Sequence, residues 1–85
     1  MAQAAIDRIL RKPEVLAATG YGATKLWMLT RDGLFPRPIH LGPQMRGWFE
    51  SEVIQMNLCR GRAAGDDEIR ALVQQLEAKR KAKAA

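Results

Sequence analysis

Apolar positions recur at helical spacing in a short segment that opens at Pro13. Proline suits the first turn of a helix because its missing N–H would have no helical partner there. Val15 and Leu16 give the segment a small apolar face, and Gly20 supplies a residue at which helices commonly end. The pattern therefore predicts a first helix over residues 13–19.

A second helical pattern begins just after a glycine-containing turn. Leu26, Leu29 and Thr30 fall on one face of it, so we expect them to point into the core. Gly33 is a natural left-handed position at which this helix stops. Two short helices joined by a glycine turn are typical of a helix-turn-helix. The face opposite the core presents Thr24, Lys25, Met28 and Arg31, with Trp27 at its border.

The pattern then changes from helical to alternating. Pro36 and Pro38 exclude a continued helix, and the segment Arg37–Leu41 alternates as a strand. A loop at residues 42–45 and a return strand over Arg46–Phe49 complete a β-hairpin. Because a two-stranded hairpin is marginally stable alone, we expect its apolar residues to pack onto the helices. These residues are Ile39, Leu41 and Trp48.

Two more helices are predicted in the second half of the chain. The first opens at Glu50–Glu52 and turns Val53, Met56 and either Leu58 or Cys59 inward. The last helix follows a linker and carries apolar residues at the i, i+3, i+4, i+7 spacing. This stripe either packs on the same domain, pairs two chains, or belongs to a partly frayed helix. Its members are Ile69, Leu72, Val73 and Leu76.

Together these elements predict a mainly α fold with a small β-hairpin, namely a winged helix-turn-helix plus a C-terminal helix. The N-terminal residues favour a strand-like arm near Ile9–Arg11. We divide the chain into an N-terminal arm (1–12), a winged helix-turn-helix domain (13–60), a linker (61–65) and a C-terminal amphipathic basic helix (66–85).

The chain of 85 residues carries a net charge of +5. The excess lies at the N-terminal arm and at the hairpin, since residues 33–49 hold Arg37 and Arg46 and no acidic residue. A basic surface favours an anionic partner such as nucleic acid, although surplus lysines also serve solubility.

Catalytic and metal chemistry find little support. His40 is the only histidine and Cys59 the only cysteine, whereas a zinc site needs three or four protein ligands. No glycine-rich phosphate motif is present. We therefore expect no enzymatic activity, no cofactor and no metal. A single cysteine fits a reducing cytoplasm. With neither a signal-peptide pattern nor an apolar run of about 18 residues, we expect a cytoplasmic protein without a membrane partner.

Recognition of DNA by a helix-turn-helix needs short polar and basic residues near the start of its second helix, with phosphate contacts around them. Thr24 and Lys25 stand at that position, and Arg31 lies within reach of a backbone phosphate. The hairpin adds four candidates for the backbone or the adjacent groove: Arg37, His40, Gln44 and Arg46. Three aromatic residues are expected in the core instead, because so small a domain needs them inside: Trp27, Trp48 and Phe49.

A series of motifs spans residues 13–57: a helix start, a turn, an aromatic in the second helix, a proline-rich run, a second turn, a tryptophan and another helix start. In this chain they are Pro13-Glu14-Val15, Thr19-Gly20, Trp27, Arg31-Asp32-Gly33-Leu34-Phe35-Pro36-Arg37-Pro38, Leu41-Gly42-Pro43, Trp48 and Glu52-Val53. The series resembles the AlpA-type regulators and related phage excisionases, which have a winged-helix, MerR-like fold.

The resemblance implies double-stranded DNA as the partner of a bacterial or phage-encoded, nucleoid-associated protein. Such proteins control prophage or integrative-element genes, or act as recombination directionality factors beside an integrase. An integrase or RNA polymerase is thus an expected protein partner. The wing positions of the family fall on His40 and Gln44. Its base-reading positions fall on Ala23, Thr24, Lys25 and Met28.

The predicted recognition helix carries only Lys25 and Arg31 as cations, and relatives often have arginine where Met28 stands. Few base contacts predict weak binding by one molecule, and hence self-association on repeated sites. The same shortage of cations on this helix supports an alternative: a protein-interaction module that inhibits or adapts another regulator without sequence-specific DNA binding.

Overall fold

The computed structural model describes the backbone of residues 6–84 and the side chains of residues 6–81. This part of the chain forms β1 (Ile9–Leu10), α1 (Lys12–Thr19), α2 (Ala23–Arg31), β2 (Ile39–Gly42), β3 (Met45–Phe49), α3 (Glu50–Gly61) and α4 (Asp66–Ala84). The predicted mainly α fold with a small hairpin and a C-terminal helix is confirmed. Residues 1–5 of the predicted arm and residue 85 of the predicted last helix lie outside the described residues.

The first two helices end where the glycines predict. Gly20 has a φ of 80°, and its N–H donates to the carbonyl of Leu16 over 2.8 Å. Gly33, with a φ of 77°, follows α2. At the start of α1 the carboxylate of Glu14 accepts the N–H of Arg11 over 2.8 Å, which satisfies one of the donors that a helix end leaves free. Local sequence therefore sets the length of both helices.

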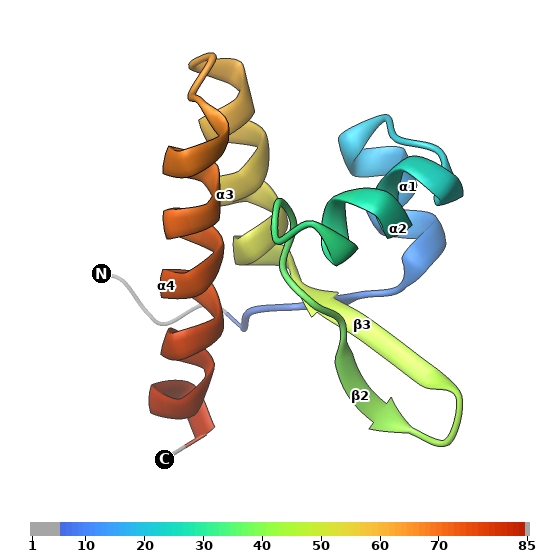
Figure 1. The fold of residues 1–85 in the computed structure, drawn as a ribbon. Helices are drawn as coiled ribbons and strands as arrows, with labels where there is room; N and C mark the ends of the chain where they lie inside the picture. The colour runs from blue at the N-terminus through green and yellow to red at the C-terminus, as the bar shows by residue number, and fades with distance from the viewer. Residues whose placement is uncertain (1–5, 85) are drawn as a thin grey trace.

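The strands form one antiparallel sheet in the order β1-β3-β2. The predicted strand-like arm is confirmed as β1, in which Ile9 lies opposite Phe49 and Leu10 opposite Trp48. The hairpin is therefore supported on one edge by the arm rather than standing alone. Figure 1 shows the β2–β3 hairpin projecting away from the helices.

Leu41 does not pack onto the helices as predicted; its side chain is 39 % exposed, whereas Ile39 is half-buried. The register of the hairpin shifts between His40 and Gly42, so the simple alternation of faces is lost at Leu41. Its side chain lies over Gly47 instead: a Cβ at Gly47 would come within 3.1 Å of Leu41 Cδ1.

The core joins both halves of the chain. Trp48 donates its indole N–H to the carbonyl of Pro36 over 2.8 Å, and its ring meets Phe35 edge-on with centroids 6.4 Å apart. In α3, Cys59 is buried and Leu58 is 53 % exposed, so Cys59 is the one of these two residues that faces inward. The buried apolar residues are Leu10, Val15, Leu26, Leu29, Leu34, Phe35, Trp48, Val53, Met56, Cys59, Ile69, Val73 and Leu76.

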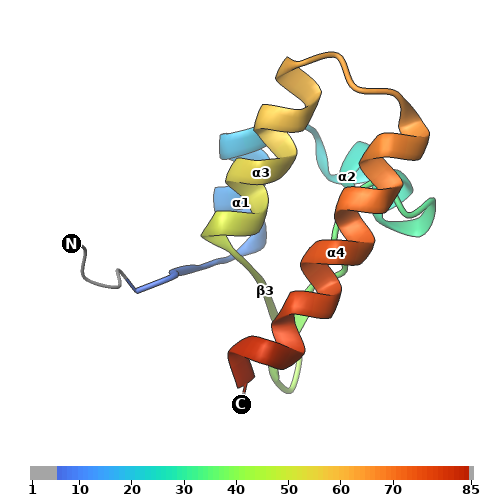
Figure 2. The same ribbon diagram turned by 90° about the vertical axis from the view of Figure 1, so that its left-hand side faces the viewer.

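The apolar stripe of α4 packs on the same chain. Ile69, Val73 and Leu76 are all buried in the common core, while Leu72 is partly buried against it. Figure 2 shows α4 lying across the domain beside α3. Of the three predicted alternatives, packing on the same domain is therefore the one observed. Because these side chains are already buried within one molecule, they are not exposed for pairing two chains.

The connection between α3 and α4 is a tight turn rather than a loose linker. Helix α3 includes Gly61, the first residue of the predicted linker. The left-handed residue of the turn is Ala63, with a φ of 59°, and the N–H of Ala64 donates back to the carbonyl of Cys59 over 3.3 Å. This pattern of bonds closes the end of α3.

A buried ion pair fastens α4 to α3. Glu52 is 1 % exposed, and its two carboxylate oxygens accept from Nε and Nη2 of Arg80 over 2.8 and 2.7 Å. The hydrogen bond to Glu52 raises the pKa of Arg80 above its usual value, so the guanidinium stays charged.

Helix α4 also binds the segment that connects α2 to β2. Arg80 donates to the carbonyl of Arg37 over 2.7 Å, and Glu77 accepts the N–H of Arg37 over 2.9 Å. Nearer the start of α4, Nε of Arg70 donates to the carbonyl of Asp32 over 3.2 Å. The path between the second helix and the hairpin is thus held at both ends by one helix.

The described part of the arm caps α3. The carboxylate of Asp7 accepts the N–H of Ser51 over 3.0 Å and its hydroxyl over 2.6 Å. An acidic side chain at a helix N-terminus satisfies free donors and interacts favourably with the helix dipole.

Replacing Arg80 by methionine is expected to destabilise the fold by about 3 kcal/mol, because it leaves the buried charge of Glu52 without a partner. Lys81→Met removes an exposed charge next to it and should change stability by no more than about 0.5 kcal/mol. Urea denaturation of both variants measures the difference. Equal midpoints for the two would contradict a stabilising role for the pair.

Candidate nucleic-acid interface

Helix α2 carries the predicted recognition residues on its exposed face. Leu26 and Leu29 are 2 % and 6 % exposed and anchor the helix to the core. Because successive residues of a helix are about 100° apart, these anchors turn Thr24, Lys25 and Met28 toward solvent, and all three are exposed. The predicted orientation of this helix is therefore confirmed.

Trp27 is not a core residue, contrary to the prediction. Its side chain is 62 % exposed, and the guanidinium carbon of Arg31 lies 5.0 Å from the centre of its ring. Trp48 and Phe35 already fill the aromatic part of the core, and Trp27 lies about a quarter turn away from Leu26 around the helix. The stacked cation holds the indole in a defined position on the surface.

Arg31, predicted to contact the DNA backbone, makes a second local contact. Its Nε donates to the carboxylate of Asp32 over 3.0 Å. This hydrogen bond lowers the pKa of Asp32 below its usual value, so that carboxylate stays ionised. Both side chains are about half exposed, and the charge of Arg31 is therefore partly compensated on a surface that water still reaches.

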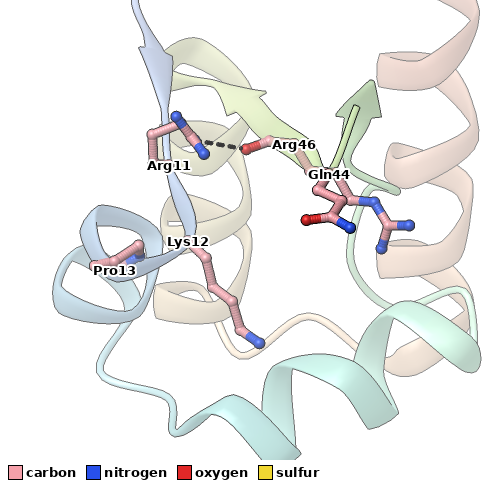
Figure 3. A pocket seen from close by; sticks show the side chains of 5 residues that line it. All are labelled: Arg11, Lys12, Pro13, Gln44 and Arg46. Carbon is pink, nitrogen blue, oxygen red and sulfur yellow. Dashed lines mark hydrogen bonds between the residues drawn. The ribbon is translucent and has the colours of Figure 1, made fainter. Parts of the chain in front are cut away.

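Three adjoining hollows lie between the start of α1, helix α2 and the hairpin. The first, of about 400 Å³, is drawn in Figure 3. The third hollow, of about 480 Å³, opens between α2 and β2. The second, of about 160 Å³, lies between the first hollow and the third. Arg46 lines all three hollows, so its side chain is shared between them, and we take them together as one surface. No carboxylate lines any of them among the described side chains. We call this surface the basic face and define it by Arg11, Lys12, Arg31, Arg37, His40 and Arg46.

The structure brings most of the predicted backbone residues together. One hollow is lined by four of them together with Trp27; the four are Arg31, Arg37, His40 and Arg46. Gln44 lines the first hollow. Of the predicted base-reading residues, Ala23 lines the middle hollow. The other three lie on the exposed side of α2 outside the hollows: Thr24, Lys25 and Met28.

Comparison with known proteins identifies the family. Residues 8–56, more than half of the chain, match the family model described as "Prophage CP4-57 regulatory protein (AlpA)". The chain belongs to the AlpA family. It is also 37 % identical, over 59 residues, to "Uncharacterized protein ORF88" of Enterobacteria phage P4. That match covers 69 % of this chain and 65 % of the length of the phage protein. No solved structure gives a significant match.

The description of the AlpA family names a regulatory protein of a prophage. The matched segment runs from the arm into α3 and contains every residue of the basic face. Helix α4, which holds residues 32–37 in this AlpA-family protein, lies outside the matched residues. None of the described helices is long and apolar enough to span a membrane.

Sequence reasoning omitted three residues of this surface in the AlpA-family protein. The sequence shows an excess of charge in the arm, but no local pattern reveals that β1 pairs with β3 and brings Arg11 and Lys12 to the hairpin. Trp27 was assigned to the core from the needs of a small domain. The signal that identifies it is its helical position, which differs from that of the anchors Leu26 and Leu29.

The two tryptophans of the AlpA-family protein should respond differently to substitution. Trp27→Ala is expected to change the free energy of unfolding by no more than about 0.5 kcal/mol, since the side chain is exposed. Trp48→Phe leaves the buried carbonyl of Pro36 without its donor and should cost about 1–3 kcal/mol. Chemical denaturation measures both values, and a larger loss for Trp27→Ala would place that residue in the core after all.

Proposed function

We propose that the protein is a sequence-specific DNA-binding regulator of a prophage or integrative element, acting on transcription or as an excisionase. The observation that carries the proposal is the basic face: α2 and the hairpin border one concave surface with several cations and no carboxylate among its described lining residues. Such a surface complements the phosphates on both sides of a DNA groove.

In this proposal α2 enters the major groove, which is wide enough for an α-helix. The residues placed against the bases are Ala23, Thr24, Lys25 and Met28. Thr24 and Lys25 lie in the first turn of α2 and present a hydroxyl and a cation as hydrogen-bonding groups. Met28 is 40 % exposed and offers an apolar contact, such as a thymine methyl group requires.

The hairpin is placed on the adjacent groove or on the backbone. Its contacts, together with the end of α2, come from Arg31, Arg37, His40, Gln44 and Arg46. Arg37 is well suited to this role because its backbone N–H and carbonyl are bound by Glu77 and Arg80. A side chain on a fixed backbone loses less conformational freedom when it meets a phosphate.

Phosphate contacts fix the register of a protein on DNA but carry no sequence information. A helix with four base-reading candidates, one of them alanine, supplies few specific hydrogen bonds. We therefore expect weak binding by one molecule and cooperative binding to repeated sites. An integrase gene beside the gene for this protein would favour the excisionase role. Contact with an integrase or with RNA polymerase stays a prediction.

A gel-shift titration against fragments from the protein's own genetic neighbourhood, in about 150 mM salt, tests the function. Lys25→Ala should reduce the preference for the bound fragment about fivefold to a hundredfold, the range of one base contact of about 1–3 kcal/mol. Arg37→Ala and Arg46→Ala should instead weaken binding to all sequences alike and lower the salt slope by about one.

Lys79→Ala is the matched control, since Lys79 is an exposed cation of α4 that does not line the basic face. Equal and weak affinity of the wild-type protein for every fragment would defeat the sequence-specific claim, because non-specific binding is largely driven by phosphates.

A second candidate is a module that binds and adapts another regulator. The observation in its favour is the apolar character of α2, where Trp27 and Met28 are 62 % and 40 % exposed. This candidate predicts that a double variant, Lys25→Ala with Arg46→Ala, captures the same protein partner as the wild type while neither retains DNA.

A further inference from the structure

The first hollow of the basic face lies away from the recognition helix proper, between the start of α1 and the turn of the hairpin. Its lining residues are Arg11, Lys12, Pro13, Gln44 and Arg46. In Figure 3 the side chain of Lys12 extends from α1 toward α2, and Gln44 and Arg46 project from the hairpin, with the guanidinium of Arg46 on the side away from Lys12. Three cations and one amide thus line one opening.

The charges of this hollow are not compensated locally. Among the described residues, no carboxylate forms an ion pair with Lys12 or Arg46. The acid nearest in sequence, Glu14, accepts the N–H of Arg11 over 2.8 Å and lies 3.6 Å from the guanidinium of Arg8. Its charge is engaged by other partners, and it does not line the hollow.

A side-chain hydrogen bond links the two walls of the hollow. Nε of Arg11 donates to the carbonyl of Arg46 over 3.0 Å, which ties the junction of β1 and α1 to β3. Gln44 has a φ of 59°, a left-handed conformation that glycine or asparagine usually adopts in turns. The hairpin therefore carries a long amide side chain at its turn, where a small residue is the easier choice.

We propose that this hollow binds one phosphate of the DNA backbone, through the ammonium of Lys12, the guanidinium of Arg46 and the side-chain amide of Gln44. This inference rests on the proposed function and extends it. All three groups donate hydrogen bonds, and the two cations provide the charge that a phosphodiester attracts.

The position of the hollow gives this contact a role. Because Lys12 and Arg46 also line the middle hollow beside Ala23 and Trp27, the phosphate bound here is close along the strand to those contacted by α2 and the hairpin. The DNA footprint then reaches the arm. The contact holds the start of α2 at a fixed position along the groove.

Salt dependence of binding is the first measurement. Lys12→Gln should make the slope of log K against log salt concentration about 0.9 shallower, the value of one released counterion. Between 50 and 200 mM salt, wild type should therefore lose about 3.5-fold more affinity than the variant. Lys79→Gln removes the same charge from the exposed side of α4 and should leave the slope nearly unchanged. Thermal unfolding of both variants checks that they remain folded.

A second measurement identifies the phosphate itself. The bound fragment is prepared with an uncharged methylphosphonate at one backbone position at a time. At one position we expect the neutral group to weaken wild-type binding at least as much as Lys12→Gln does, and to weaken binding of Lys12→Gln by clearly less, because only Arg46 and Gln44 still contact that phosphate in the variant. Such non-additivity marks a direct contact.

The outcomes separate the two proposals. If wild type binds its fragment selectively but Lys12→Gln and Lys79→Gln behave alike, or every methylphosphonate acts additively with Lys12→Gln, the phosphate site is wrong and the proposed function stands. If wild type shows no preference among fragments, the sequence-specific function fails. In that case the salt slopes still decide whether the hollow binds phosphate non-specifically.

Discussion

The carboxylate of Glu52, removed from water and paired with Arg80, governs the arrangement of the whole molecule. A buried charge is tolerated only where a partner and hydrogen bonds replace its hydration. The partner here comes from α4, nearly thirty residues away in sequence, so α3 can keep Glu52 only if α4 lies alongside it. The same guanidinium reaches the carbonyl of Arg37. One side chain therefore joins α3, α4 and the approach to the hairpin.

This arrangement determines how the candidate interface is held together. The segment from Asp32 to Arg37 connects α2 to β2, and any movement within it would change the angle between the recognition helix and the wing. It is held from one side by α4, through Arg70 and Glu77, and from the other by Trp48, whose indole binds the carbonyl of Pro36. A structure with so small a core thus keeps α2 and the hairpin in fixed relation.

The features that could be predicted from the sequence are those set by local backbone conformation. Gly20, Gly33 and Pro36 require or exclude particular backbone conformations, so the ends of α1 and α2 and the change to a hairpin were predictable. Long-range pairing was not. Glu52 reads as an ordinary acid in the first turn of a helix, and nothing near it points to Arg80.

The same difference between local features and long-range pairing applies to the candidate site. The orientation of α2 followed from helical periodicity, so Thr24, Lys25 and Met28 were expected at the surface. The prediction that Trp27 lies in the core was wrong because the need for buried aromatic side chains is a property of the whole domain. The rings of Phe35 and Trp48 already fill that need. Lys12 was overlooked because only the pairing of β1 with β3 brings the arm to the hairpin.

Gly47 shows how small a feature can carry such a constraint. A Cβ at this position would lie 2.5 Å from Cγ2 of Ile9 and 2.9 Å from the carbonyl oxygen of Leu10. Substitution by any larger residue would push the arm off β3. Lys12 begins α1 just after β1, and β3 carries Arg46 one residue before the glycine. The close pairing of β1 with β3, which brings the start of α1 to the hairpin, thus depends on a hydrogen atom where every other amino acid has a carbon.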